Sequence, residues 1–140
     1  MSVAESESAW VEPGRLVEVL RELGYKTSWS ADGGQLVEFE AAGYRCHVVP
    51  YPPSDLQLAV GFLKQNETFD LATINRLNLH HRFAKLVVDR DGDLLILLDI
   101  ALSRVTMEAA ASLLRDCLDT WEEVVTDVVA SLNEEYPSGH

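Results

Sequence analysis

The stretch FAKLVVDRDGDLLILLDIA, residues 83–101, predicts a β-hairpin and decides the fold class. Two strand-like runs, 83–89 and 93–101, flank Arg90-Asp91-Gly92, where the Asp-Gly pair supplies the positive backbone angles that a tight turn needs. The second run is apolar on both faces, with Asp99 as its one internal charge. We therefore expect a strand that is covered on both sides, by a helix on one and by a partner chain or another helix on the other.

Strands are also expected before this hairpin, because apolar residues there recur with a period of two. The expected segments are 25–30, 35–41, 44–51 and 56–63. Asp32-Gly33-Gly34 and Ala42-Gly43 are short enough to join hairpins, whereas Pro52-Pro53-Ser54 requires a wider corner. The order predicts an antiparallel meander.

Helical spacing appears before, between and after the strands. Pro13 suits a helical first turn, and Gly24 is the stop residue of the short helix that follows. Asp70 is the expected N-cap of a middle helix that runs toward His80. The element order is therefore α-β-β-β-β-α-β-β-α, which predicts an α+β domain with helices packed on an antiparallel sheet.

The last helix is the longest, with Thr106 as its expected N-cap and Leu132 near its end. Its apolar residues follow alternating steps of four and three: Leu114, Leu118, Trp121, Val125, Val128 and Leu132, widened by Ala110, Cys117 and Val124. So wide a stripe favours packing on the domain's own sheet over a free coiled coil.

Length and composition fit one domain, since 140 residues with 47% hydrophobic content can build one continuous core. We expect a single domain over residues 11–134, with a disordered tail at 1–10 and a second tail at 135–140.

The chain is strongly acidic, with 11 Lys and Arg against 23 Asp and Glu and a formal charge of -12. This charge repels phosphate backbones and anionic lipid headgroups, so we expect neither nucleic acid nor a membrane as a partner. The N-terminal residues lack the basic and apolar regions of a signal peptide, and a cytoplasmic location is the expectation.

No motif for catalysis or cofactor binding is recognisable. Ser54 and Ser103 lack a nucleophile elbow, and Gly33-Gly34 is expected between two strands rather than before a helix. Cys46 and Cys117 have no metal-type spacing, and buried, reduced thiols are expected. Asp99 is explained by a structural ion pair or by an exposed position.

The sequence contains two groups of potential metal ligands. Alternate aspartates in 89–93 suggest a calcium loop, but Leu94 and Ile100 stand where an EF-hand requires Gly and Glu, so a solvated turn is favoured. His80 and His81 are neighbours, and neighbours in a helix point about 100° apart, so we do not expect them to share an ion. No metal site and no cofactor are predicted.

The middle helix and the hairpin carry a resemblance to a known family. Ile74-Asn75-Arg76-Leu77-Asn78, Arg82-Phe83-Ala84-Lys85, the turn from Asp89 to Leu94, and Val105-Thr106 resemble the YbjN family over residues 15–132. That family is similar in architecture to the CesT-like type III secretion chaperones, which are small acidic dimers that hold effectors in extended form. The resemblance implies a middle helix near a two-fold axis and apolar strips that receive a partner's strand or helix. It supplies no catalytic residues.

The leading hypothesis is a non-enzymatic, homodimeric protein- or peptide-binding domain, chaperone-like or adaptor-like. The expected dimer contacts are Leu71, Ile74, Leu77 and Asn78, and Ile74→Asp is the variant expected to disrupt them. The alternative is a stress-response regulator of the YbjN type that binds a folded signalling partner. An enzyme or metal protein would rest only on scattered histidines and aspartates.

Overall fold

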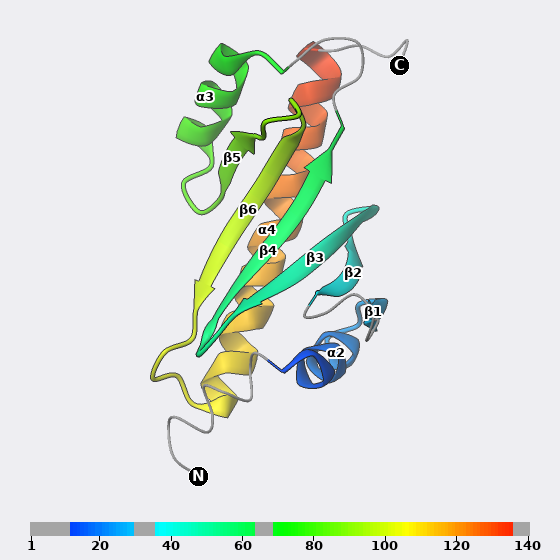
Figure 1. Ribbon diagram of the computed structural model, residues 1–140, viewed down its shortest axis with the longest axis vertical. Coiled ribbons are helices and arrows are strands. Elements are labelled where there is room, and N and C mark those ends of the chain that lie inside the picture. Colours follow the sequence, from blue (N-terminus) through cyan, green and yellow to red (C-terminus); the bar gives the residue numbers. More distant parts are fainter. Residues whose placement is uncertain (1–11, 30–35, 64–68, 136–140) are drawn as a thin grey trace.

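The computed structural model describes residues 12–29, 36–63 and 69–135, which form three helices and a six-stranded antiparallel sheet (Figure 1). The elements are α2 (Pro13–Glu22), β1 (Thr27–Trp29), β2 (Val37–Ala41), β3 (Tyr44–Tyr51), β4 (Asp55–Phe62), α3 (Leu71–His80), β5 (Lys85–Val88), β6 (Leu94–Ala101) and α4 (Met107–Glu135). The predicted α+β class and element order are confirmed. The predicted turn at Asp32-Gly33-Gly34, the tail at 1–10 and residues 136–140 lie outside the described residues.

The strand order in the sheet is β1-β2-β3-β4-β6-β5. The first four strands form the predicted meander, and β6 then pairs with β4 along its whole length, from Asp55↔Ala101 to Phe62↔Leu94. The hairpin therefore places its more apolar strand inside the sheet and leaves the shorter β5 at the edge. A position inside the sheet suits β6, because β4 pairs with its whole length and β5 pairs with Leu94 to Leu97.

The core lies between α4 and one face of the sheet. The predicted stripe of α4 is buried along its length, with Leu114, Trp121 and Val128 each 0% exposed. The Trp121 indole N–H donates to the Sγ atom of Cys46 on β3 at 3.4 Å, which joins the middle of α4 to the sheet. Packing of the stripe on the domain's own sheet is confirmed.

The predicted helix ends are confirmed by their hydrogen bonds. The Asp70 side chain accepts from the backbone N–H of Ala72 at 3.3 Å at the start of α3. The Thr106 hydroxyl accepts from the backbone N–H of Ala109 at 3.2 Å at the start of α4. Gly24, with φ +97°, follows the end of α2 in a conformation that favours glycine.

The β5–β6 turn differs in one detail from the expectation. Within it only Gly92 has a positive φ, at 87°, so Asp91 does not share that conformation. The Asp89 carboxylate instead accepts from the backbone N–H groups of Asp91 and Asp93, at 2.9 and 3.0 Å. The side chain therefore holds a longer turn that needs one left-handed residue.

The β2–β3 turn contains strain that one substitution can relieve. Ala42 has φ 53° and Gly43 has φ 83°, and Ala41 pairs directly with Tyr44, so two left-handed residues close the hairpin. An L-residue other than Asn, Asp or Gly is unfavourable there. We expect Ala42→Asn to raise the free energy of unfolding by about 0.5–1 kcal/mol in urea titration. Ala42→Val is the control and should lower it.

Candidate functional site

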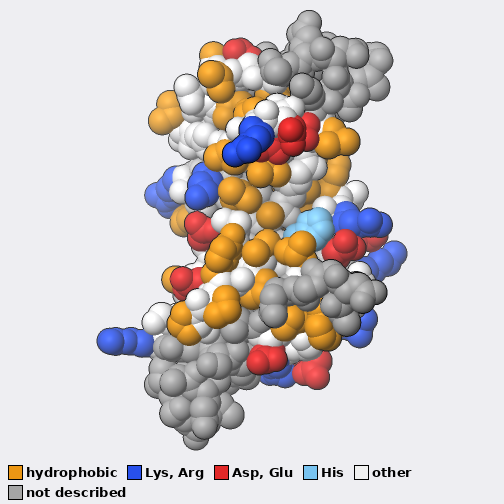
Figure 2. Space-filling view, viewed as in Figure 1, with side chains coloured by type: hydrophobic (Ala, Val, Ile, Leu, Met, Phe, Trp, Pro, Cys, Tyr) orange, Lys and Arg blue, Asp and Glu red, His pale blue; other side chains and the backbone are white. Residues whose placement is uncertain are grey.

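The face of the sheet turned away from α4 carries apolar side chains over which no described helix packs. Alternate residues of β6 are buried against α4, whereas Leu95 and Leu97 between them are only half-buried. The corresponding positions on the neighbouring strands extend this apolar surface. We name it the outer strip and define it as Val49, Ala59, Val87, Leu95 and Leu97. Figure 2 shows apolar side chains crossing this face between charged ones.

The sequence allowed a second helix to cover the outer face of β6. Within the described residues no helix does so, and that part of the expectation is wrong. The inner face of β6 is covered by α4, and its outer face is not. The double-sided apolar pattern has a different cause, because the outer residues contact one another across strands. Ala59 pairs with Leu97, and Val87 pairs with Leu95. The Cδ2 atom of Leu95 also lies 3.3 Å from the position that a Cβ atom would occupy on Gly61. Cover by a partner chain stays a prediction.

Polar side chains beside the outer strip pair with one another. The Asp99 carboxylate accepts from Gln57 Nε2 at 2.7 Å and lies 3.9 Å from Lys85 Nζ, and its side chain is 66% exposed, so the expected ion pair and the expected exposed position are both present. These side chains are exposed, so the ion pair adds little to stability. The pair places two opposite charges beside the apolar surface.

The free edge of β5 is closed at its centre by Asn78. The Asn78 amide donates to the carbonyl oxygen of Leu86 at 2.9 Å and accepts from its N–H at 2.7 Å. Both backbone groups that an added strand would use at Leu86 are therefore already satisfied. Strand addition, which the resemblance allows, is blocked at this point of the edge.

The four residues expected at a dimer interface differ in their surroundings. Ile74 and Leu77 are each 4% exposed and belong to the core of their own chain, and Asn78 holds the edge of β5. Leu71 is 68% exposed and is accessible to another chain. The dimer itself stays a prediction. Of these four residues, Leu71 is the one whose side chain can contact a partner while the core stays intact.

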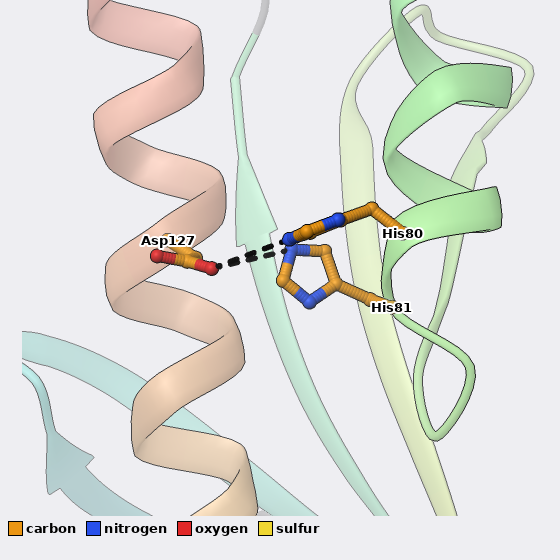
Figure 3. A group of neighbouring side chains, drawn as sticks. All are labelled: His80, His81 and Asp127. Atoms are coloured by element: carbon orange, nitrogen blue, oxygen red, sulfur yellow. Dashed lines mark ion pairs between the residues drawn. The ribbon is translucent and has the colours of Figure 1, made fainter.

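His80 and His81 do converge, contrary to the expectation from helical geometry. Helix α3 ends at His80, and His81 has φ -109° and ψ 87°, so the two rings are not separated by a helical step. Their centroids lie 4.7 Å apart, and both Nε2 atoms turn toward the carboxylate of Asp127 on α4, as Figure 3 shows. The distances to Asp127 Oδ2 are 3.8 Å from His80 and 3.9 Å from His81.

His81 is the unusual member of this group. Its side chain is 9% exposed, and its buried Nε2 has no hydrogen-bond partner. Burial lowers the pKa of His81, nearby His80 lowers it further, and Asp127 opposes both effects. The sequence reasoning missed Asp127, which occupies an ordinary polar position of an amphipathic helix and carries no local signal.

The aspartates of the β5–β6 turn also lie close together, since Asp89, Asp91 and Asp93 offer oxygens within 4.8 Å of one another. The turn itself uses Asp89 Oδ1, which accepts two backbone N–H groups. The turn's own hydrogen bonds thus explain this cluster, as the interpretation as a solvated turn expected.

Both cysteines are free thiols. Cys46 is 0% exposed, as expected, whereas Cys117 is only half-buried. Burial raises the pKa of both thiols, and Asp116 adds to the effect at Cys117. A raised pKa favours the thiol over the thiolate that nucleophilic chemistry requires.

A hollow beside the β2–β3 turn is lined by three acidic side chains, Glu40, Asp119 and Glu122, and by one basic side chain, Lys26. Tyr25 lies there near Glu122 and Asp119, and burial, followed by these carboxylates, raises the pKa of Tyr25 to about 12. The hollow is thus unsuited to anions.

No helix in the described part of the chain combines the length and the apolar character needed to cross a bilayer.

Comparison with known proteins places this fold in a family. The model of the YbjN family, described as "Putative bacterial sensory transduction regulator", matches residues 12–134. The structure is similar to the crystal structure of YbjN from E. coli, described as "a putative transcription regulator", with a TM-score of 0.63 and 15% sequence identity over 84% of this chain and 90% of that chain. The comparison with curated proteins found no match. The likeness to type III secretion chaperones stays a prediction.

The family match extends from the start of α2 to the last turn of α4, and the solved relative has the same fold. The resemblance at the middle helix and hairpin is thereby confirmed, and the chain belongs to the YbjN family.

Proposed function

We propose that this chain is a non-enzymatic, protein-binding regulator that docks a partner polypeptide on the outer strip. The observation that carries this proposal is the apolar character of a sheet face that no described helix covers. Val87 at the edge of the strip is 37% exposed, and its neighbours are half-buried by one another. Contiguous apolar surface of this kind is typical of interaction sites on soluble proteins.

The surroundings of the outer strip support the same proposal. Protein interfaces commonly have an apolar centre and a polar rim. The rim here includes the Lys85–Asp99 pair on one side and Glu38 with Arg45 on the other, at 3.9 and 3.8 Å. Fixed charges beside an apolar centre favour partners with a matching charge pattern and disfavour others.

The chemistry of the partner follows from charge and from the closed edge. A chain with a formal charge of -12 attracts a partner whose apolar surface is flanked by basic residues. Because Asn78 satisfies the backbone of Leu86, a helix lying across the face suits this site better than a strand added at β5.

Two forms of the partner fit this proposal. The descriptions of the family and of E. coli YbjN name regulators, and in the first form this chain regulates by binding a folded protein. A chaperone-like domain would instead hold an unfolded segment and keep it soluble. The two are distinguished by whether the isolated partner is folded and soluble without this chain.

A homodimer remains part of the proposal, with Leu71 as the contact residue that best fits it. Leu71 and Leu79 are exposed on α3, at 68% and 88%. Their exposure supports an α3 interface separate from the outer strip.

A charge placed at the centre of the outer strip should abolish docking. The partner is recovered by crosslinking in native cells, purified, and titrated against each variant. We expect Leu97→Lys to weaken its binding by about 30-fold or more, because a central interface position becomes a cation that must be buried. Leu97 is half-buried on the solvent side of β6, so the fold should persist.

The matched control is Ser112→Lys, which adds the same charge at an exposed position of α4. It should bind the partner like the unmodified chain. Equal affinity of Leu97→Lys and Ser112→Lys, with both variants folded, would contradict docking on the outer strip.

A further inference from the structure

The cluster of His80, His81 and Asp127 joins the end of α3 to the C-terminal half of α4. Each residue offers one ligand atom, and these atoms all lie within 4.8 Å of one another. Two imidazole nitrogens and one carboxylate oxygen thus face a common point, as Figure 3 shows. The cluster lies on the α4 side of the sheet, away from the outer strip.

We propose that His80, His81 and Asp127 form a binding site for a divalent transition metal ion of the Zn²⁺ class. This inference is independent of docking on the outer strip, because the two surfaces share no residue.

The distances fit such an ion with little rearrangement. Zinc binds imidazole nitrogen and carboxylate oxygen at about 2.0–2.2 Å, so ligand atoms in a tetrahedral site lie roughly 3.4 Å apart. The two Nε2 atoms are 3.8 and 3.9 Å from Asp127 Oδ2. These two distances need to shorten by only a few tenths of an ångström, and all three ligand atoms already lie within 4.8 Å of one another.

The buried nitrogen of His81 is the independent observation that points to a ligand. A polar atom that is buried without a partner costs free energy, and native proteins rarely leave one so. His81 Nε2 is buried and unpartnered, and at 3.9 Å the Asp127 carboxylate is too far to accept a hydrogen bond from it. A metal ion between the two would satisfy both.

The donor set selects the class of metal. Imidazole is a preferred ligand of Zn²⁺, Ni²⁺ and Cu²⁺, whereas Ca²⁺ and Mg²⁺ favour oxygen-only sites. Three protein ligands also leave a position open for water or for a group from a partner. The aspartates of the β5–β6 turn differ from this donor set. They offer only oxygens, and the Asp89 carboxylate already accepts hydrogen bonds within the turn.

Binding would have a mechanical consequence. A metal ion would link the end of α3 to α4. It would thereby also hold in place the Asn78 side chain of α3, which closes the edge of β5. An ion that binds only the folded state also raises its stability by mass action.

The test uses the full chain, purified with a removable tag that contains no histidine and stripped with a chelator. Calorimetric titration with Zn²⁺ should show one site. The midpoint of thermal unfolding should rise by roughly 5–10 °C at a hundredfold excess of free Zn²⁺ over its Kd, and fall again on chelation. Ca²⁺ at the same concentration should produce no such rise.

Two variants that each remove one ligand group, together with a control, locate the site. His80 and Asp127 are exposed, at 70% and 62% of their side chains, so His80→Asn and Asp127→Asn should fold. Each should weaken Zn²⁺ binding by about tenfold or more and remove the thermal shift. The control is His47→Asn, which removes a histidine outside the cluster whose Nε2 lies 3.5 Å from Glu38 Oε1. It should change neither the Zn²⁺ affinity nor the thermal shift. Absence of the site in the unmodified chain, or full Zn²⁺ affinity in both variants, would overturn the proposal.

Discussion

We expect Ile74→Asp to unfold this protein rather than to separate a dimer. Ile74 is 4% exposed in the core of its own chain, so the substitution removes a buried apolar side chain and places a carboxylate among apolar neighbours. Core truncation and burial of an unpaired charge are both among the largest single-residue effects. We expect a loss of more than about 4 kcal/mol in the free energy of unfolding, measured by far-UV circular dichroism in urea.

Leu71→Asp is the matched control, because it makes a comparable change on the same helix at a position that is 68% exposed. The free energy of unfolding should change by about 0.5 kcal/mol or less, since a carboxylate in the first turn suits the helix dipole. The variant therefore tests the proposed α3 dimer in a folded protein, by light scattering coupled to size exclusion. A native-like stability for Ile74→Asp would contradict its position in the core.

Trp121→Ala has the second large expected effect. The Trp121 side chain is fully buried in the middle of α4, and its N–H donates to Cys46 Sγ at 3.4 Å. Truncation leaves a cavity between α4 and β3 that rigid strands cannot fill. We expect the free energy of unfolding to fall by about 3–5 kcal/mol.

Trp121→Phe separates the two contributions, because it retains most of the ring volume and loses the N–H group. It should cost less than half as much as Trp121→Ala, since a hydrogen bond to sulfur is weak. Equal losses in the two variants would show that the hydrogen bond, and not the cavity, dominates.

The secondary structure was readable from the sequence because its signals are local. Asp70 and Thr106 cap helices by bonding backbone groups two or three residues away, and the wide stripe of α4 specifies the face that meets the sheet. Each of these features depends on period or on a nearby side chain. Features that depend on contacts between distant segments of the chain were not predictable in this way.

The order of β5 and β6 in the sheet is one such feature. A hairpin signal at Asp89–Asp93 is the same whichever strand lies inside, and only pairing with β4 decides it. The apolar pattern of β6 predicts cover on both faces, but outer residues such as Leu97 are shielded by neighbouring strands and not by a second described helix. Periodicity does not distinguish these two causes.

The histidine cluster shows the same limit in a different way. The expectation that His80 and His81 diverge holds inside a helix, but α3 ends at His80 and the next residue leaves helical geometry. The third residue of the cluster, Asp127, is distant in the sequence and is adjacent to the histidines only in the fold. The convergence of the two rings depends on where α3 ends, and helix ends are poorly determined by a sequence pattern.

The most direct test of docking on the outer strip is photo-crosslinking in native cells. A photoreactive amino acid replaces either Val87, which is exposed on the strip, or Ser112, which is exposed on α4. We predict that position 87 yields a covalent adduct with another polypeptide and that position 112 does not. Adducts from position 112 alone, or equal adducts from both positions, would contradict it.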